Sequence, residues 1–301
     1  MTGWTAANIP DQRGRTAVVT GANSGLGLVT ATELARHGAH VVLAVRNTAA
    51  GAEAARRIGG DVEVRELDLA SLDSVRAFAA KLAADLPAID LLVNNAGAVL
   101  LGRRRVCADG FELHLATNML GHFALTGLLL DRLAAAAAPR VVSLSSVTHR
   151  GAHLDFDDLM FERDFRASAA YGRSKLATTI FGVELDRRLR AAGSPVVSVL
   201  AHPGITRTNL TPRAWEDRGR SGRVIAWLGL LFTQSLEQGT LPQLRAATDP
   251  GVRGGQFFGP ARLGETRGPV AEARLSREAA DPAAGRRLWA AAEELTGVRY
   301  L

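Results

Sequence analysis

Short apolar runs rich in β-branched residues alternate with alanine-rich stretches of helical periodicity along the 301-residue chain. The runs that we expect to form strands are Thr16–Thr20, His40–Val45, Val62–Leu67, Ile89–Asn94, Arg140–Ser145, Pro195–Ala201 and Gln256–Phe258. The stretches that we expect to form helices are Leu26–His37, Ala49–Ile58, Leu72–Ala84, Gly110–Ala137 and Ala169–Ala192. Every connection between successive strands is long enough for a crossover helix. The alternation therefore predicts an α/β fold, a doubly wound parallel sheet of seven strands with helices on both faces.

One domain is the simplest organisation for this chain. Its hydrophobic fraction of 47% and charged fraction of 22% are those of an ordinary globular protein, and it contains neither a Pro/Ser linker nor a repeat of about 20–50 residues. We therefore expect residues 1–301 to form a single domain. The segment from Ile205 to Gln234 breaks the α/β rhythm, and we interpret it as a substrate-lid insertion at about 205–234. Its apolar run Val224–Phe232 fits core packing, the wall of a lipophilic pocket, or a surface that touches a membrane or a partner.

The net charge of the chain is +6, from 36 Lys and Arg against 30 Asp and Glu. A basic balance can indicate a nucleic-acid partner, but such proteins usually cluster their basic residues on one surface. Here nearly all of the basic residues are arginines scattered in ones and twos, and the only lysines are Lys81 and Lys175. We therefore expect no nucleic-acid partner, and the retained Lys175 becomes a candidate for chemistry that arginine cannot perform.

The single cysteine, Cys107, excludes an intrachain disulfide and a cysteine-rich metal site. His149 and His153 are four residues apart, but no carboxylate–histidine metal motif surrounds them, so we expect no metal. The first fifteen residues lack the basic-then-apolar order of a signal peptide, and no apolar run reaches the roughly 20 residues that span a bilayer. These features predict a cytoplasmic protein without a transmembrane segment.

The first predicted strand ends in Thr20-Gly21-Ala22-Asn23-Ser24-Gly25-Leu26-Gly27 and leads directly into a helix. Free backbone N–H groups and the helix dipole at such a helix start can hold a pyrophosphate. The Gly-x3-Gly-x-Gly spacing differs from the more common G-x-G-x-x-G pattern. A turn in which the glycines serve chain geometry alone is the other interpretation.

Polar residues also follow the next strands at what would be the same edge of the sheet. Arg46 ends the second strand, about twenty residues past the glycines. A guanidinium at this position would attract the 2′-phosphate of NADP(H), so we expect NADP(H) to be preferred over NAD(H). An ordinary exposed arginine is the alternative interpretation. Asp68 ends the third strand, although it fits equally well as a cap of the helix that Ser71 begins. The tetrapeptides Asn94–Gly97 and Ser143–Ser146 close the fourth and fifth strands.

Tyr171 and Lys175 stand four residues apart at the start of a predicted helix, so that both polar groups project from one side. An ammonium group beside a phenol lowers the pKa of the phenol from about 10 towards the working range. The pair is therefore a candidate general acid and base. An incidental pair on a solvated face is the alternative, but the chain has only two tyrosines and two lysines.

These residues together resemble the single-domain branch of the short-chain dehydrogenases/reductases, which have a Rossmann-like fold. The motifs are T-G-x3-G-x-G at 20–27, N-N-A-G at 94–97, Y-x3-K at 171–175 and P-G at 203–204. The segments Thr117–Phe123, Val142–Ser146 and His202–Gly204 are most similar to those of the group that contains retinol dehydrogenases and protochlorophyllide reductases. The span Thr148–Arg166 fits the insert of that group, and His202 before the P-G turn is interpreted as structural.

The resemblance implies an NADP(H)-dependent oxidoreductase that interconverts a carbonyl and an alcohol on an apolar small molecule. Its implied catalytic residues are Asn118, Ser146, Tyr171 and Lys175. Tyr171 would transfer the proton, Ser146 rather than Ser145 would bond the same oxygen, Lys175 would bind the nicotinamide ribose, and Asn118 would hold a water that links Lys175 to solvent. The implied cofactor-binding residues are Gly21, Asn23, Ser24, Gly25, Leu26, Gly27, Arg46, Asp68, Leu69, Asn95, Gly97, Tyr171, Lys175, Pro203 and Thr206. The usual dimers and tetramers of the family make a homo-oligomer the expected assembly.

Two other functions remain open from the sequence. A protein that senses NADP(H) without turnover needs only the glycine loop and Arg46, so the complete catalytic set argues against it. A sugar-nucleotide epimerase or dehydratase usually carries a larger C-terminal substrate domain, for which about 100 residues after Pro203 leave little room.

Overall fold

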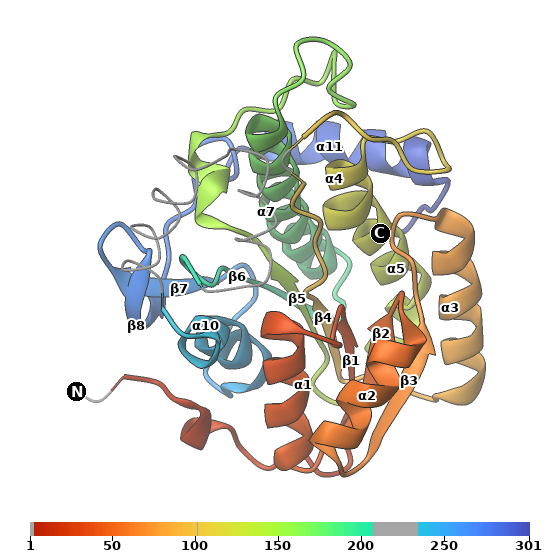
Figure 1. Cartoon of the computed structure of the whole chain (residues 1–301), viewed down its shortest axis with the longest axis vertical. Coiled ribbons are helices and arrows are strands. Elements are labelled where there is room, and N and C mark those ends of the chain that lie inside the picture. Colours follow the sequence, from red (N-terminus) through yellow and green to blue (C-terminus); the bar gives the residue numbers. More distant parts are fainter. Residues whose placement is uncertain (1–2, 101, 207–233) are drawn as a thin grey trace.

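One continuous sheet of eight strands lies at the centre of the computed structural model (Figure 1), which describes residues 3–100, 102–206 and 234–301. The strand order is β3-β2-β1-β4-β5-β6-β7-β8. The strands are β1 (Thr16–Thr20), β2 (His40–Val45), β3 (Val62–Glu66), β4 (Leu91–Asn94), β5 (Arg140–Leu144), β6 (Val197–Ala201), β7 (Phe257–Arg262) and β8 (Arg267–Glu272). Strands β1 to β7 are parallel. The predicted doubly wound parallel sheet is confirmed.

The predicted count of seven strands is wrong, because β8 adds an antiparallel strand at the edge beside β7. Its sequence Arg267-Gly268-Pro269-Val270-Ala271-Glu272 is not a β-branched run, and Gly and Pro usually argue against a strand. At an edge the missing N–H of Pro269 leaves no ladder bond unmade. The strand β7 also continues four residues past the predicted end at Phe258, through Pro260, which pairs with Val270.

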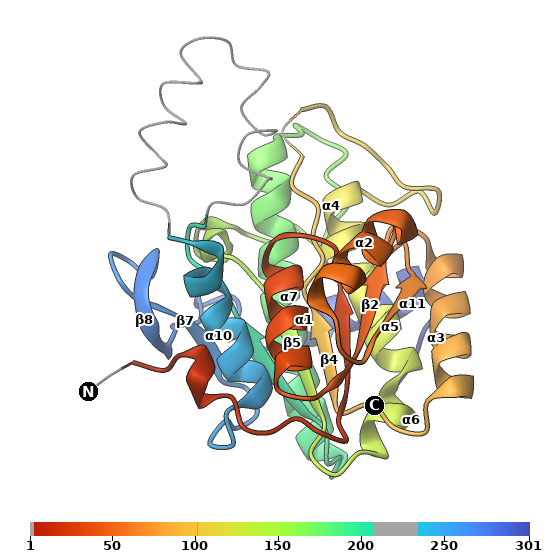
Figure 2. The same cartoon turned by 60° about the horizontal axis from the view of Figure 1, so that its bottom comes forward.

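Helices cover both faces of the sheet. Figure 2 shows α1, α2 and α10 together on one face, whereas α3, α5, α7 and α11 pack against the other. The helices are α1 (Gly25–Arg36), α2 (Thr48–Ile58), α3 (Leu72–Asp85), α4 (Leu113–Leu115), α5 (Gly121–Leu128), α6 (Leu130–Ala134), α7 (Ala167–Ala191), α10 (Leu236–Thr248) and α11 (Pro282–Thr296). The described residues also form 3-10 turns at Ala6–Asn8 and Val147–Gly151. With both faces covered, β4 is buried along its whole length and β1 at every residue after Thr16.

The prediction of a single helix over Gly110–Ala137 is wrong. The structure divides it into α4, a π-helical turn at Ala116–Leu120, α5 and α6. Gly121 begins α5 against the backbone of the loop after β3, since a Cβ at Gly121 would lie 2.3 Å from the Leu69 carbonyl oxygen. Leu129, with φ −101° and ψ 2°, separates α5 from α6. The interruptions follow from these tertiary contacts, and a π-turn of this kind often marks a functional position.

Most of the expected lid at about 205–234 lies outside the described residues, which include only Ile205, Thr206 and Gln234 of that segment. The run Val224–Phe232 is outside them as well. After Pro203 the described chain adds α10, β7, β8 and α11 to the same sheet and its helical layers rather than a second domain. Among the described ranges, no helix is long and apolar enough to cross a membrane.

The C-terminal helix α11 is anchored by an aromatic cluster. Trp289 is 2% exposed, and its ring centroid lies 5.0 Å from that of Phe123 and 4.8 Å from that of Tyr300. The Tyr300 hydroxyl donates a hydrogen bond to the Phe123 carbonyl oxygen at 3.1 Å. Because Phe123 belongs to α5, the cluster holds α11 against the helix that follows the π-turn.

Replacing Trp289→Ala should lower the free energy of unfolding by about 3–5 kcal/mol, because it leaves a cavity between α5, α7 and α11. Urea denaturation followed by far-ultraviolet circular dichroism measures this loss. Arg286→Ala, at an exposed position of the same helix, should change it by less than about 0.5 kcal/mol. Equal effects of the two substitutions would contradict the anchoring role of Trp289.

Candidate active site

The carboxyl ends of β1 and β4 mark the point at which the strand order reverses, since the chain runs from β1 outward to β2 and β3 and then returns to β4. Open α/β sheets bind ligands in the crevice at such a switch point. The glycine loop follows β1, and the segment Asn94–Gly97 ends β4. The sequence-predicted site residues therefore meet at one edge of the sheet.

Three glycines of the loop after β1 are required by local geometry. Gly21 and Gly25 have φ values of +67° and +58°, a region that residues with a Cβ rarely adopt. A Cβ at Gly27 would lie 2.5 Å from Asn95 Nδ2 and 2.6 Å from the Gly21 carbonyl oxygen. A Cβ at Gly25, in contrast, would meet nothing within 4 Å. The loop is tightly packed on its inner side and open above Gly25.

The helix α1 begins at Gly25 with Ser24 as its N-cap, and the Ser24 side chain makes no capping hydrogen bond. The backbone N–H groups of the first turn are thus available to an anion, whose charge the helix dipole would stabilise. Asn23, Ser24 and Leu26 are at least partly accessible around this helix start. The open space and the uncapped helix start fit the pyrophosphate of a dinucleotide.

Arg46 lies at the end of β2, one strand away from the glycine loop, because Thr20 pairs with Ala44. The Arg46 side chain is exposed and has no ion-pair partner among the described residues. The next residue, Asn47, caps α2 by accepting a hydrogen bond from the Ala50 N–H at 3.0 Å. The contact of Arg46 with a 2′-phosphate stays a prediction.

Asp68 and Leu69 stabilise the turn between β3 and α3. Asp68 Oδ1 accepts a hydrogen bond from the Ala70 N–H at 3.0 Å, while the Asp68 N–H donates to Ser74 Oγ at 2.9 Å. Ser71 provides the cap of α3 through the Ser74 N–H. Leu69 is buried. The structure therefore gives Asp68 a role in the turn before the helix, and its contact with a cofactor stays a prediction.

The end of β4 joins the glycine loop to the catalytic residues. Asn95 Nδ2 donates to the Thr20 carbonyl oxygen at 2.7 Å, and Thr20 Oγ1 accepts the N–H groups of Asn95 and Ala96 at 3.0 and 2.9 Å. Two residues further on, a Cβ at Gly97 would lie 3.3 Å from Asn118 Oδ1 and 3.4 Å from Lys175 Nζ. Gly97 thus borders both the cofactor side and the catalytic side of the crevice.

Asn118 lies in the π-turn and is fully engaged with protein groups. Its Oδ1 accepts the Ala98 N–H at 2.7 Å, and its Nδ2 donates to Ser174 Oγ at 2.8 Å. Its carbonyl oxygen has contacts with Thr178 Oγ1 at 3.1 Å and His122 Nδ1 at 3.2 Å. Both lone pairs of this carbonyl are therefore in use, so a water there would have to displace one partner. The water-mediated role of Asn118 stays a prediction.

The two serines after β5 face different groups. Ser145 Oγ donates to the Lys175 carbonyl oxygen at 3.1 Å and contacts Thr179 Oγ1 at 2.7 Å, so it is buried against α7. Ser146 Oγ instead accepts the Thr148 N–H at 3.3 Å and acts on the Tyr171 phenol, whose pKa it lowers. This arrangement favours Ser146 over Ser145 as the residue that faces a substrate.

The pKa of the Tyr171 phenol is raised in this structure, whereas the sequence led us to expect a lowered value beside Lys175. Burial raises the pKa of the Tyr171 phenol, and the Ser146 hydroxyl acts in the opposite direction. The Lys175 ammonium donates to the Leu144 carbonyl oxygen at 2.8 Å, and its own pKa is lowered to about 8 by burial. Desolvation therefore dominates the electrostatics of both groups.

Sequence reasoning missed three buried side chains around this set. His122 Nε2 lies 2.9 Å from Thr20 Oγ1 and so connects the glycine loop to the Asn118 carbonyl. His114 Nε2 accepts the Leu100 N–H at 3.0 Å, while its Nδ1 bonds Glu112 Oε1 at 2.7 Å. The His114 ring lies edge-on to Tyr171 at 6.3 Å between centroids. His122 lies within the Thr117–Phe123 segment and His114 lies just before it, and their polar character in an otherwise apolar stretch is the signal that could have identified them.

Pro203 and Thr206 belong to a turn that follows β6. Its Gly204 has φ +66°, and the Pro203 carbonyl accepts Gln234 Nε2 at 2.6 Å. Thr206 is 8% exposed and pairs with Gln234. The preceding His202 is fully buried and bonded to Glu265 and to the Gly204 N–H, which agrees with the structural role expected for it.

Comparison with known proteins gives a consistent result. Residues 15–219 match the family model of the short chain dehydrogenases. Human retinol dehydrogenase 13 is 39% identical over 301 residues, covering 97% of this chain and 86% of that protein. An uncharacterized protein from Mycobacterium Paratuberculosis has a solved structure with a TM-score of 0.83 and 42% identity, covering 100% of both chains. RhlG of Pseudomonas aeruginosa, solved as an NADP active-site complex, has a TM-score of 0.65 at 25% identity, covering 81% of this chain and 94% of that one.

The chain therefore belongs to the short-chain dehydrogenase family of oxidoreductases. Within the family it is similar to the retinol dehydrogenases, among them retinol dehydrogenase 14 of Homo sapiens at 36% identity and retinol dehydrogenase 12 of Bos taurus at 38%. The resemblance inferred from the ordered motifs is confirmed.

Two buried histidines should make the stability of the protein fall in mild acid. Burial lowers the pKa of both His122 and His202 to about 4, whereas the unfolded chain takes up a proton below about pH 6.5. The unfolded state thus binds more protons between those values, so the free energy of unfolding decreases as the pH falls from about 6.5 to 4, by up to about 1.4 kcal/mol per pH unit for each histidine.

Urea denaturation at pH 7, 6 and 5 measures this slope. His122→Gln removes one buried histidine and should reduce the slope by up to about 1.4 kcal/mol per pH unit. His202 and the buried His149, whose pKa burial also lowers, keep their contributions. His153→Gln, whose side chain is 79% exposed, should leave the slope unchanged. A slope equally steep in wild type and His122→Gln would contradict the assignment.

Proposed function

We propose that the protein is an NADP(H)-dependent dehydrogenase/reductase that interconverts a carbonyl and an alcohol on an apolar small molecule. The observation that carries the proposal is the arrangement of three groups at the catalytic end of the crevice: the Ser146 hydroxyl bonds the Tyr171 phenol, and the Lys175 ammonium lies beside Gly97. The similarity to retinol dehydrogenases supports an apolar alcohol or aldehyde as substrate. An NADP complex of the structural relative RhlG supports the cofactor.

Tyr171 is the general acid in the direction of reduction. NADPH, held by the glycine loop and Arg46, would supply the hydride to the carbonyl carbon. Because burial raises its pKa, the Tyr171 phenol is protonated at neutral pH and can donate its proton to the oxygen that becomes the alcohol. Ser146 lies close enough to affect the same phenol and can donate a hydrogen bond to the substrate oxygen as negative charge develops there. Oxidation of the alcohol uses the same groups in reverse.

Lys175 fixes the polar environment of this proton transfer. Its ammonium is held by the Leu144 carbonyl, at the end of β5, next to Gly97 and Asn118. With a pKa of about 8 it carries a positive charge at neutral pH. Arginine has a larger planar head and a pKa that burial does not bring to this range, which explains why a lysine stands here.

The glycine loop, the start of α1 and Arg46 fit the adenosine and pyrophosphate portions of the cofactor. The uncapped helix start would hold the pyrophosphate. Arg46 would pair with the 2′-phosphate, because a guanidinium forms bidentate, charge-assisted bonds with phosphate. We propose on this basis that NADP(H) is preferred over NAD(H).

Tyr171→Phe should reduce turnover by about 10²–10⁴-fold, since it removes the proton donor, while NADPH affinity stays within about twofold. A panel of apolar aldehydes and ketones that includes retinal, followed by NADPH absorbance, measures the rate. Tyr300→Phe is the matched control, because Tyr300 is the other tyrosine of the chain and bonds Phe123 in the α5–α11 packing. Undiminished turnover in Tyr171→Phe would exclude the proposed role.

Arg46→Ala should weaken NADPH binding by roughly 10–100-fold, which is the expected loss of a charge-assisted contact of about 1.5–3 kcal/mol. Its affinity for NADH should change little. Quenching or enhancement of nicotinamide fluorescence in titrations of both cofactors gives the ratio. Arg57→Ala, at an exposed position of α2, serves as the control for loss of one surface charge. An unaltered NADPH/NADH ratio in Arg46→Ala would show that the 2′-phosphate is bound elsewhere.

A further inference from the structure

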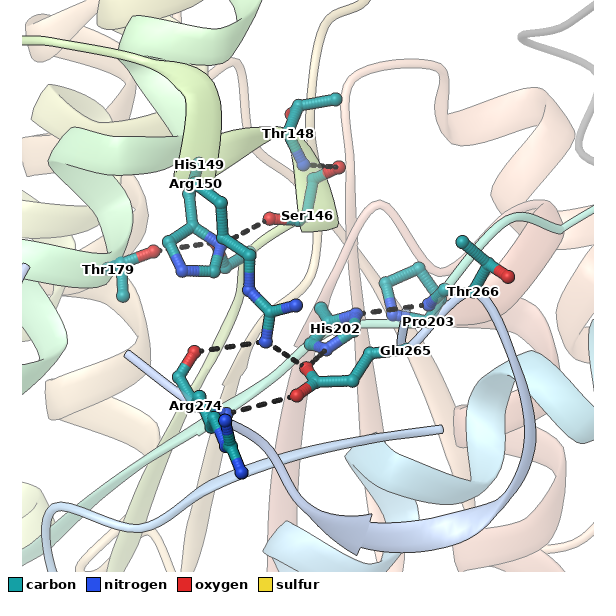
Figure 3. Close-up of polar contacts among 12 residues, drawn as sticks. Ser146, Thr148, His149, Arg150, Thr179, His202, Pro203, Glu265, Thr266 and Arg274 are labelled. Carbon is teal, nitrogen blue, oxygen red and sulfur yellow. Dashed lines mark hydrogen bonds and ion pairs between the residues drawn. The ribbon is translucent and has the colours of Figure 1, made fainter. Parts of the chain in front are cut away.

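Glu265 occupies the turn between β7 and β8 but directs its carboxylate towards the interior, as Figure 3 shows. Its φ of +66° lies in the left-handed region, where a residue other than Gly is uncommon and costs free energy. Its side chain is only 16% exposed. An acidic residue held in this conformation at a surface turn indicates that its contacts compensate for the strain.

The first contact of Glu265 is with the turn after β6. Its Oε2 lies 3.1 Å from His202 Nε2, and His202 Nδ1 accepts the Gly204 N–H at 3.2 Å. Because Nδ1 accepts, the proton of the neutral ring is on Nε2 and is donated to Glu265. The backbone adds further bonds, since the Ile205 N–H donates to the Thr266 carbonyl at 2.9 Å. The carboxylate therefore fixes the His202 side chain, which in turn bonds the backbone of the turn after β6.

The second contact is with the turn that follows Ser146. Arg150 lies near the end of the 3-10 turn that Ser146 caps, and its Nη2 atom is 2.5 Å from Glu265 Oε2. Arg150 Nη2 also donates to the Arg274 carbonyl oxygen at 3.2 Å, and the Arg274 N–H donates to Glu265 Oε1 at 3.3 Å. Together these bonds outweigh burial and lower the pKa of the Glu265 carboxyl. Figure 3 shows His202, Arg150 and Arg274 around the one carboxylate.

The two turns that meet at Glu265 follow neighbouring strands, because β5 pairs with β6. The reacting end of a dinucleotide must lie beside Ser146 and Tyr171, which places it next to the turn after β6. By the proposed function, its adenosine end would lie further along the same edge of the sheet, at β1 and β2. Glu265 thus contacts the side of the crevice where hydride transfer would occur, and not the side of Arg46.

We propose that Glu265 is a positioning residue that holds the His202–Thr206 turn and the Ser146–Arg150 turn in the relative placement required by the nicotinamide end of the cofactor. The inference rests on the proposed function. Glu265 acts through His202 and Arg150 and touches no reacting atom itself. Displacement of reacting groups by about 1 Å can cost up to about 10²-fold in rate, so loss of this bridge has a measurable effect.

The test compares two probes in the full-length protein: NADPH, and adenosine 2′,5′-bisphosphate, which has the 2′-phosphate but no nicotinamide. Glu265→Ala should weaken NADPH binding by about tenfold and leave the affinity for adenosine 2′,5′-bisphosphate within about twofold, as measured by isothermal titration calorimetry. Glu265→Gln keeps an oxygen that can accept from His202 but loses the charge opposite Arg150, and should give an intermediate loss. Glu272→Ala, an exposed carboxylate on the same hairpin, should change neither affinity.

Equal weakening of both probes, or no weakening of either, in the Glu265 variants would overturn the positioning role. If Glu265→Ala does not fold, the same two-probe comparison on Glu265→Gln decides the matter by the same criterion. A wild-type protein that binds the bisphosphate but not NADPH also overturns it. A wild-type protein that binds neither probe would instead refute the proposed cofactor, and this inference with it, before any variant is made.

Discussion

The contact between the ends of β1 and β4 determines where the rest of the site can lie. Thr20 closes β1, and its hydroxyl and carbonyl groups are bonded by the backbone and side chain of Asn95. The approach is so close that Gly21 and Gly27 have no room for a Cβ. Because the glycine loop is held there, α1 starts directly above the crevice, and the residues that follow β4 pass towards Asn118 and Lys175. The predicted cofactor-binding residues and the predicted catalytic residues are thus connected through this one contact between β1 and β4.

Desolvation is the second physical theme of the site. Burial lowers the pKa of His122 and His202, lowers that of Lys175 to about 8, and raises that of Tyr171. Each group is thereby brought towards its neutral form, and each has hydrogen-bond partners that fix its orientation. A low-dielectric site of this kind strengthens the interactions that a substrate oxygen would make with Ser146 and Tyr171. The packing of α5 and α7 on β5 therefore both fixes these side chains and shifts the pKa values on which proton transfer would depend.

The sequence was informative wherever a signal is local. The strands β1 to β6 could be predicted to within one or two residues, because each is an apolar run bounded by polar residues or turns. The glycine spacing, Arg46 and the Tyr171–Lys175 pair could be recognised for the same reason. The strand β8 was missed, since its stability comes from pairing with β7 rather than from its own composition. The division of the helix at 110–137 was missed because the close approach of Gly121 to Leu69 is tertiary. Glu265 and His202 are 63 residues apart, and no periodicity connects them.

The antiparallel edge formed by β8 has a consequence for how copies of the chain can associate. Exposed sheet edges invite pairing with another chain unless proline, bulges or charges interrupt them. On this side Pro269 lies within β8, and the pairing with β7 is irregular between Pro260 and Arg262. On the other side β3 presents Glu63 and Arg65, which pair with each other at 2.9 Å. Both margins of the described sheet therefore carry features that oppose its growth into an intermolecular sheet.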